Sequence, residues 1–259
     1  MPVVLTERKN NWVHVTLSRP EIHNAFNAAM IRELTETFAK ITGDRAVRGV
    51  VLKGAGKSFC AGADLEYMKS MAGFTREENL RDARALFEMF EAIFDCPVPV
   101  LGQLHGHVMG GGLGLTACCD IVAAEAGTKF CFSEVKIGIV PAVISPFVLK
   151  KVPQHFAREV MMTGEIFGAA KAEKMGLVHF TGEGEEVGDF IEGKIDFIQN
   201  AGPEAVRSTK RLLTDSSFAN WDRMKDETIE LISERRTSPE GQEGIRAFLD
   251  KRKPKWKAD

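Results

Sequence analysis

The stretch VMGGGLGLTACCD, residues 108–120, decides the fold and the chemistry expected of this chain. Three consecutive glycines and Gly114 lie between a strand-like run, VLGQL (100–104), and a helix-like run. A glycine inside a helix costs about 1 kcal/mol relative to alanine, so these glycines need a reason. Glycine lets a ligand approach the backbone, and the first N–H groups of a helix have no intrahelical acceptor. We expect this segment to present backbone amides to a negatively charged oxygen.

A second segment, GKSFCAGADLEYM (56–68), has the same organisation. It follows the strand-like run GVVLKG (49–54) and leads toward a helix. Two such loops from neighbouring strands can direct two amides at one oxygen, which is the arrangement of an oxyanion hole. The start of the segment is not a phosphate-binding loop, because Val51 stands where that motif requires glycine.

A third candidate is Glu134, in KFCFSEVKIGIVPAVISPF (129–147). A carboxyl group among apolar residues has a raised pKa and can act as a general acid or base near neutral pH. A paired structural carboxylate is equally compatible with this stretch.

Composition excludes several classes of protein. A net charge of −2 over 259 residues gives no general attraction to nucleic acid or membranes, and no apolar run is long enough to span a bilayer. The start of the chain lacks the order of a signal peptide, and the five cysteines show no CxxC spacing. They predict free, buried thiols in a reducing cytoplasm. The pair His105 and His107 lacks further ligands, so turn or core histidines are favoured over a metal site.

The hydrophobic pattern predicts a sheet flanked by helices, followed by a helical C-terminal part. Predicted strands are 3–8, 12–18, 49–54, 100–104 and 120–125, and predicted helices are 27–42 and 76–94. The segments 154–176, 186–200, 203–215 and 220–251 are predicted to be mostly helical. In the helix 76–94, one side carries Leu80, Ala83, Phe87, Phe90 and Phe94, which we expect to face the core.

These motifs, in this order, resemble the crotonase (enoyl-CoA hydratase/isomerase) superfamily. The resemblance runs through RPEIHNAFN, SFCAGADL, GHVMGGGLGL, CCDI and FSEVKIGIVP, and covers nearly the whole chain. It implies an α/β fold: a crotonase-like spiral of ββα units over residues 1–200 and a helical C-terminal trimerisation region over 201–259. It also implies a homotrimer or a dimer of trimers.

The resemblance assigns roles to individual residues. The N–H groups of Ala63 and Gly111 would hold the thioester oxygen of an acyl-CoA, and Glu134 would be the catalytic acid or base. Contacts to the adenine and pantetheine of coenzyme A would come from Ala25, Ala61, Ala63, Asp64 and Leu65. Coenzyme A is part of the substrate, so no separate cofactor and no metal are expected. Lys57 or a C-terminal lysine would meet its 3′-phosphate.

The chain departs from the two-glutamate hydratases at Gly114, where those enzymes carry a second catalytic acid. Glu134 would therefore act alone in adding water to a 2-enoyl-CoA, or in removing it. The stretches MKSMAGFTREENLRDARALF and SEVKIGIVPAVISPFVLKKV look like bacterial methylglutaconyl-CoA hydratases of leucine degradation, whose substrate has a distal carboxylate. Lys69, Arg81 or Arg84 would pair with that carboxylate, although for each cation taken singly solvation on a helix surface is the favoured explanation. Gly110 and Gly114 would also lie against the substrate, whose carboxylate would fill the space left at Gly114.

Other activities fit the same motifs. A lone glutamate suffices for Δ3,Δ2-enoyl-CoA isomerisation, and the same oxyanion hole suits decarboxylation of a glutaconyl thioester. A dehalogenase is excluded, because Ala142 stands where its nucleophilic aspartate would be. A non-catalytic binding protein of this fold is the alternative of a different class, but it does not explain why Ala63, Gly111 and Glu134 are all retained.

Overall fold

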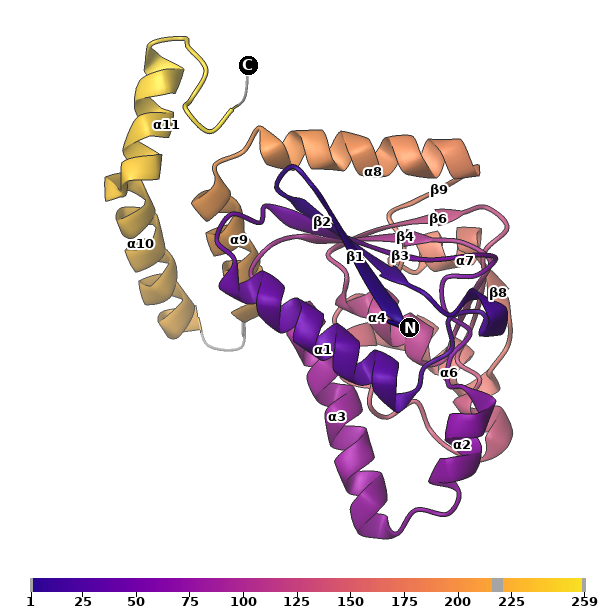
Figure 1. Ribbon diagram of the computed structural model, residues 1–259. Coiled ribbons are helices and arrows are strands. Elements are labelled where there is room, and N and C mark those ends of the chain that lie inside the picture. Colours follow the sequence, from indigo (N-terminus) through magenta and orange to yellow (C-terminus); the bar gives the residue numbers. More distant parts are fainter. Residues whose placement is uncertain (1, 216–220, 258–259) are drawn as a thin grey trace.

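The computed structural model describes residues 2–215 and 221–257. A six-stranded sheet with the order β1-β2-β3-β4-β6-β9 forms its centre (Figure 1). The antiparallel hairpin of β1 (Val4–Lys9) and β2 (Trp12–Leu17) turns at Asn10, which has φ +54°. The remaining neighbours are parallel, and the remaining strands are β3 (Gly49–Gly54), β4 (Val100–Leu104), β6 (Ile121–Glu125) and β9 (Phe180–Gly182).

A second sheet contains three short strands, β5 (His107–Met109), β7 (Lys129–Cys131) and β8 (Phe167–Gly168). An isolated bridge between Cys60 and Val108 extends this sheet on its other side. The chain thus passes repeatedly from the large sheet to the small sheet and then into a helix, which is the spiral of ββα units that the family resemblance implied. The short strands themselves were missed, because two or three residues carry too little alternation to be recognised.

Helices cover both faces of the large sheet (Figure 1). On one face α1 (Ala28–Gly43) and the end of α3 (Arg76–Phe94) pack with the buried helix α4 (Gly111–Cys118). On the other face α8 (Gly184–Gln199) packs its buried residues against Trp12 and Val51. Because side chains alternate along a strand, neighbouring residues such as Val50 and Val51 belong to the two different cores.

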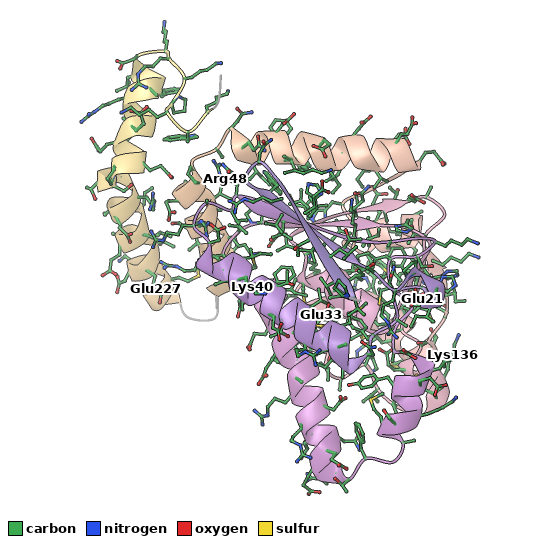
Figure 2. The ribbon with its side chains drawn as sticks, viewed as in Figure 1. Glu21, Glu33, Lys40, Arg48, Lys136 and Glu227 are labelled. Atoms are coloured by element: carbon green, nitrogen blue, oxygen red, sulfur yellow. The ribbon has the colours of Figure 1, made fainter. Side chains whose placement is uncertain are left out.

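Two long-range side-chain contacts fasten helices to this sheet, and both residues are labelled in Figure 2. The Glu33 carboxylate on α1 accepts hydrogen bonds from the N–H groups of Val3 and Val4, at 2.8 and 3.0 Å. The Arg48 guanidinium donates to the carbonyls of Ile198 and Ala201, at 2.9 and 2.7 Å, and so satisfies carbonyls at the end of α8.

The predicted core side of α3 was wrong in its first half. Leu80 is 53% exposed, whereas Met89, Phe90 and Ile93 are buried. The first turns of α3 extend beyond the sheet together with the short helix α2 (Leu65–Met71), so they have no core to face (Figure 1).

The segment 154–176 is mostly helical, as predicted, and contains two helices. Gly164, with φ +60°, ends α6 (Gln154–Thr163), and β8 separates it from α7 (Ala169–Lys174). The mostly helical segments predicted over 186–200 and 203–215 correspond to α8 and α9 (Pro203–Asp215). The shorter elements are the 3₁₀ turns η1 (Pro20–Ile22) and η2 (Glu134–Ile137) and the helix α5 (Ser145–Val148).

The segment 220–251, predicted to be mostly helical, contains two helices, α10 (Trp221–Thr237) and α11 (Pro239–Leu249), and residue 220 lies outside the described residues. Ser238 caps α11, and Pro239 at the first helical position cannot donate the hydrogen bond that would continue α10. Both helices extend away from the sheet (Figure 1). Within the ranges described, no helix is long and apolar enough to cross a membrane.

Candidate active site

The two predicted amide loops lie side by side. The Cys60 N–H donates to the His107 carbonyl at 3.0 Å, and the Met109 N–H donates to the Cys60 carbonyl at 2.9 Å. Gly62, with φ +93°, lies so close to the second loop that a Cβ atom there would be 3.2 Å from the Met109 carbonyl oxygen. The loops are adjacent because they occupy the same position in successive turns of the spiral.

The strand geometry leaves the Ala63 N–H available to a ligand. Phe26 receives a hydrogen bond from Asp64 and donates one to Gly62, at 2.8 and 2.7 Å. Peptide groups alternate along an extended chain, so the Ala63 N–H between these two points away from Phe26. It donates to no group in the described part of the chain. Ala63 is itself exposed.

The Gly111 N–H is available for a different reason. Gly111 is the first residue of α4, and a first-turn N–H has no acceptor within its own helix. The preceding N–H, of Gly110, is already bonded to the Cys131 carbonyl at 3.0 Å. Gly110 has φ +48°, a conformation that disfavours any side chain at this position. The structure therefore brings together two loops that each offer one amide, as the sequence predicted.

Glu134 lies next to this pair. It opens η2, and its Oε1 would be 3.4 Å from a Cβ atom on Gly110. Its Oε2 is buried and has no hydrogen-bond partner among the described residues, and it forms no ion pair with them. Burial raises the pKa of the Glu134 carboxyl, with a smaller opposing effect from its own backbone N–H. The paired structural carboxylate left open by the sequence is thus not what the structure contains.

Gly114 does not border an empty space. It is buried in α4, and a Cβ atom there would lie 2.5 Å from Ile144 Cγ2 and 2.7 Å from two ring atoms of Phe90. The expectation that a substrate carboxylate fills a vacancy at Gly114 is therefore wrong. An aromatic ring and an aliphatic side chain already close this side of the helix.

The predicted cations lie on the helices α2 and α3. Lys69 is exposed on α2 and pairs with Glu66 at 2.6 Å, and Arg84 is exposed on α3. Neither has a described contact with the glycine loops or with Glu134.

A residue that the sequence analysis missed joins the segments expected to contact coenzyme A. The Arg19 guanidinium donates to the Ala25 carbonyl at 2.7 Å and to the Asp64 carboxylate at 2.6 Å. The hydrogen bond from Arg19 to Asp64 is the main reason why the pKa of Asp64 is lowered. Asp64 also caps α2, while Leu65 is 73% exposed. The position of Arg19 in RPEIHNAFN was the available signal.

Asn24 forms hydrogen bonds that connect segments of the same region, and replacing it tests how much these bonds contribute to stability. Its amide donates to the carbonyls of Ala55 and Ser58, at 2.8 and 2.7 Å, and its oxygen accepts from the Arg19 N–H at 2.8 Å. Asn24 is fully buried.

We expect Asn24→Ala to lower the free energy of unfolding by about 3 kcal/mol, at about 1 kcal/mol for each lost bond. Urea denaturation measures this loss, and the exposed Asn11→Ala is the control; equal midpoints for the two variants would contradict the assignment.

His105 and His107 contact polar groups of the first loop, and the cysteines lie buried in the protein. His105 bonds the Gly56 carbonyl at 3.0 Å, and His107 lies 3.2 Å from the Ser58 hydroxyl. No group of residues suited to a metal ion occurs in the described ranges. All five cysteines are free and buried, as predicted.

A family model described as enoyl-CoA hydratase/isomerase matches residues 7–259. The chain belongs to the enoyl-CoA hydratase/isomerase family. An enoyl-CoA hydratase structure from Shewanella pealeana has a TM-score of 0.94 and 34% identity, covering 98% of this chain and 96% of that one. The (E)-benzylidenesuccinyl-CoA hydratase of Thauera aromatica is 29% identical and covers 99% of both chains. The trans-2-decenoyl-[acyl-carrier-protein] isomerase of Streptococcus mutans is 27% identical, covering 98% of this chain and 97% of the relative.

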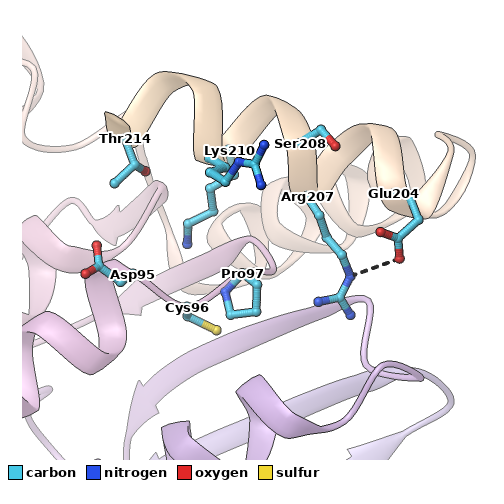
Figure 3. A pocket seen from close by; sticks show the side chains of 9 residues that line it. Asp95, Cys96, Pro97, Glu204, Arg207, Ser208, Lys210 and Thr214 are labelled. Atoms are coloured by element: carbon cyan, nitrogen blue, oxygen red, sulfur yellow. Dashed lines mark ion pairs between the residues drawn. The ribbon is translucent and has the colours of Figure 1, made fainter. Parts of the chain in front are cut away.

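This member of the enoyl-CoA hydratase/isomerase family also has cavities outside the predicted site. One, of about 320 Å³, lies between α9 and the segment Asp95–Pro97, with Arg207 and Lys210 among its lining residues (Figure 3). A neighbouring cavity of about 770 Å³ shares Lys210. Lys210 donates to the Asp120 carboxylate at 2.7 Å and to the Val98 carbonyl at 3.0 Å. The first cavity borders the segment before β4, and the second borders the amino ends of β4 and β6, whereas the glycine loops follow the carboxyl ends of β3 and β4.

Proposed function

We propose that this protein adds water to a 2-enoyl-CoA, or removes it, using the amides of Ala63 and Gly111 and the carboxylate of Glu134. The observation that carries the proposal is the buried, unpartnered Oε2 of Glu134 beside two loops that each offer a free N–H. The thioester oxygen of the substrate would accept both hydrogen bonds. Negative charge grows on this oxygen during the reaction, and losing one such donor typically costs about 3 kcal/mol in the barrier.

Glu134 supplies the proton transfers in this mechanism. Its carboxylate accepts a proton from water while the water oxygen bonds to C3 of the substrate. The electrons of the double bond move onto the thioester oxygen, where the two amides stabilise the enolate. The protonated Glu134 then delivers the proton to C2, so one water is consumed and the carboxylate is restored. A raised pKa suits this role, since the same group must accept and release a proton near neutral pH.

We propose a carboxylated enoyl-CoA, of which methylglutaconyl-CoA is an example, as the substrate. The Thauera relative supports this class, because a benzylidenesuccinyl thioester retains a free carboxylate. The carboxylate of the substrate would meet an exposed cation at the rim, such as Arg84 or Lys69, rather than the closed side of α4 at Gly114. We further propose a cytoplasmic homotrimer or dimer of trimers, with the chain dividing near residue 200 into a spiral core and an oligomerising helical region.

Isomerisation of a 3-enoyl-CoA to a 2-enoyl-CoA is the second candidate. The structure favours it at one point: Phe90 and Ile144 leave no room beside Gly114 for a second acid that would help to hold water. The Streptococcus relative, named as an isomerase, supports it too.

A panel of acyl-CoA thioesters separates these activities. We expect the absorbance of the conjugated thioester to be lost faster with methylglutaconyl-CoA than with crotonyl-CoA, by up to about fivefold, because an exposed charge contact contributes about 1 kcal/mol. Equal rates with methylglutaconyl-CoA and crotonyl-CoA would contradict the proposal of a carboxylated substrate. New conjugation from 3-enoyl-CoA without water uptake would favour the isomerase, and release of CO₂ from glutaconyl-CoA the decarboxylase. No turnover of any thioester would favour a binding protein.

A further inference from the structure

A series of hydrogen bonds runs from the Arg19 side chain to the Ala63 amide. The Arg19 guanidinium donates to the Ala25 carbonyl at 2.7 Å. The same peptide group carries the Phe26 N–H, which donates to the Gly62 carbonyl at 2.7 Å. The Gly62 carbonyl belongs to the peptide group that carries the Ala63 N–H, one of the two proposed oxyanion donors. Two peptide groups thus connect the guanidinium to this donor.

The bond between these two peptide groups sets the direction of the Ala63 N–H. The described peptide bonds are all trans, so the C=O and N–H of one peptide group point in opposite directions. The bond from Phe26 to the Gly62 carbonyl therefore directs the Ala63 N–H away from Phe26. The Asp64 N–H donates to the Phe26 carbonyl at 2.8 Å and fixes the chain on the other side of Ala63. The Ala63 amide is thus oriented by the peptide group that Arg19 holds.

Asp64 holds the guanidinium in place. Its carboxylate accepts from the second terminal nitrogen of Arg19 at 2.6 Å, and the two side chains are only 14% and 15% exposed. The other oxygen of this carboxylate accepts from the Glu66 N–H at 2.9 Å, so Asp64 is itself fixed to the start of α2. A guanidinium is planar and its donors have fixed directions. Anchoring one terminal nitrogen on Asp64 therefore keeps the other directed at the Ala25 carbonyl.

The positive charge of Arg19 strengthens the donor at the far end of the series. Hydrogen bonds from a charged group are roughly twice as strong as neutral ones, and bonds in series polarise one another by about 10–30% each. Electron density drawn toward the Ala25 carbonyl makes the Phe26 N–H more positive. The bond to Gly62 passes the same polarisation to the Ala63 N–H. A more positive N–H gains more from a developing oxyanion than from a neutral carbonyl, and this difference lowers the barrier.

We propose that Arg19 is a positioning residue that orients and polarises the Ala63 amide through the two intervening peptide groups. This inference rests on the proposed function, in which the Ala63 N–H binds the thioester oxygen. Arg19 acts through the backbone and does not contact the reacting atoms. Its replacement leaves Glu134 and Gly111 in place, so a weakened but active enzyme is expected.

The test compares Arg19→Gln with Arg19→Lys, because lysine keeps the positive charge and glutamine keeps only an N–H donor. We expect Arg19→Gln to lower kcat about tenfold, a fraction of the 10²–10³ lost when an oxyanion donor is removed entirely. Arg19→Lys is expected to retain kcat within about threefold of the wild type. The control is Arg48→Gln, which removes a guanidinium that also donates to two carbonyls, but at the end of α8. It should keep the wild-type kcat.

Infrared spectra of bound butyryl-CoA carrying ¹³C at the carbonyl separate this role from a structural one. The carbonyl frequency reports how strongly the thioester oxygen is hydrogen-bonded in the folded complex. We expect the shift to lower frequency seen with the wild type to shrink in Arg19→Gln and to be largely retained in Arg19→Lys. A purely structural role would lower the Tm or raise KM and leave the frequency of the bound thioester unchanged.

The spectra also distinguish failure of this inference from failure of the proposed function. A wild-type frequency in Arg19→Gln, or an equal loss of the shift in Arg19→Lys, would overturn the role of Arg19. If the wild type itself does not lower the carbonyl frequency, the oxyanion hole of the proposed function is wrong.

Discussion

Replacing Glu134 by glutamine is expected to lower kcat about 10²- to 10⁴-fold, the range typical of losing a general acid or base. Glutamine keeps the shape of the side chain but neither accepts nor releases a proton at neutral pH. Turnover of the best thioester from the panel measures the loss. Glu36→Gln, on the exposed side of α1, is the control and should keep full activity.

The same substitution is expected to stabilise the fold above neutral pH. Burial raises the pKa of Glu134, so the folded state binds this proton more tightly than the unfolded state does. The charged carboxylate therefore costs folding free energy above the folded pKa, and this cost disappears as the pH falls below the unfolded pKa. Glu134→Gln should have a higher Tm than the wild type at pH 8, and the difference should vanish in acid. A lower Tm at pH 8 would show that Glu134 is instead held by stabilising contacts.

Introducing the missing second acid by Gly114→Glu is expected to destabilise the protein by 3 kcal/mol or more without raising hydratase activity. The first side-chain atom already collides with Ile144 and Phe90. Overpacking of this kind costs about 1–3 kcal/mol, and burying an unpaired carboxylate adds several more. Chemical denaturation of the folded variant, or loss of soluble protein, measures the effect.

A matched glycine provides the control for this experiment. Gly188 lies in α8, and a Cβ atom there would have no neighbour within 4 Å. Gly188→Glu should be neutral or stabilising by up to about 1 kcal/mol, since glutamate favours a helix more than glycine does. If Gly114→Glu is as stable as Gly188→Glu, or gains hydratase activity, then Phe90 and Ile144 do not close this side of α4 as described.

The segments that form the candidate site were predictable because the sequence patterns that mark them are local. Glycine runs after VLGQL and GVVLKG indicated two loops at equivalent strand ends, and parallel pairing brings such ends together. Glu134 was identifiable because a single carboxylate interrupts an apolar stretch.

The parts that were not predicted depend on contacts between distant segments. The sequence shows that Gly114 lacks an acid, but only packing shows that Phe90 and Ile144 take up the space. The exposure of Leu80 likewise follows from where the sheet ends, which the helical period of α3 does not encode. Arg19 was missed because its two partners lie 6 and 45 residues away in the sequence.

The transfer of water oxygen to an enoyl-CoA tests the central claim most directly. The wild type and Glu134→Gln are incubated with methylglutaconyl-CoA in H₂¹⁸O, and the product is analysed by mass spectrometry. Our account predicts that the wild-type product gains the mass of one H₂¹⁸O, with the label at C3, and that Glu134→Gln forms almost none. A wild-type product without ¹⁸O, or equal labelling by the two proteins, would contradict it.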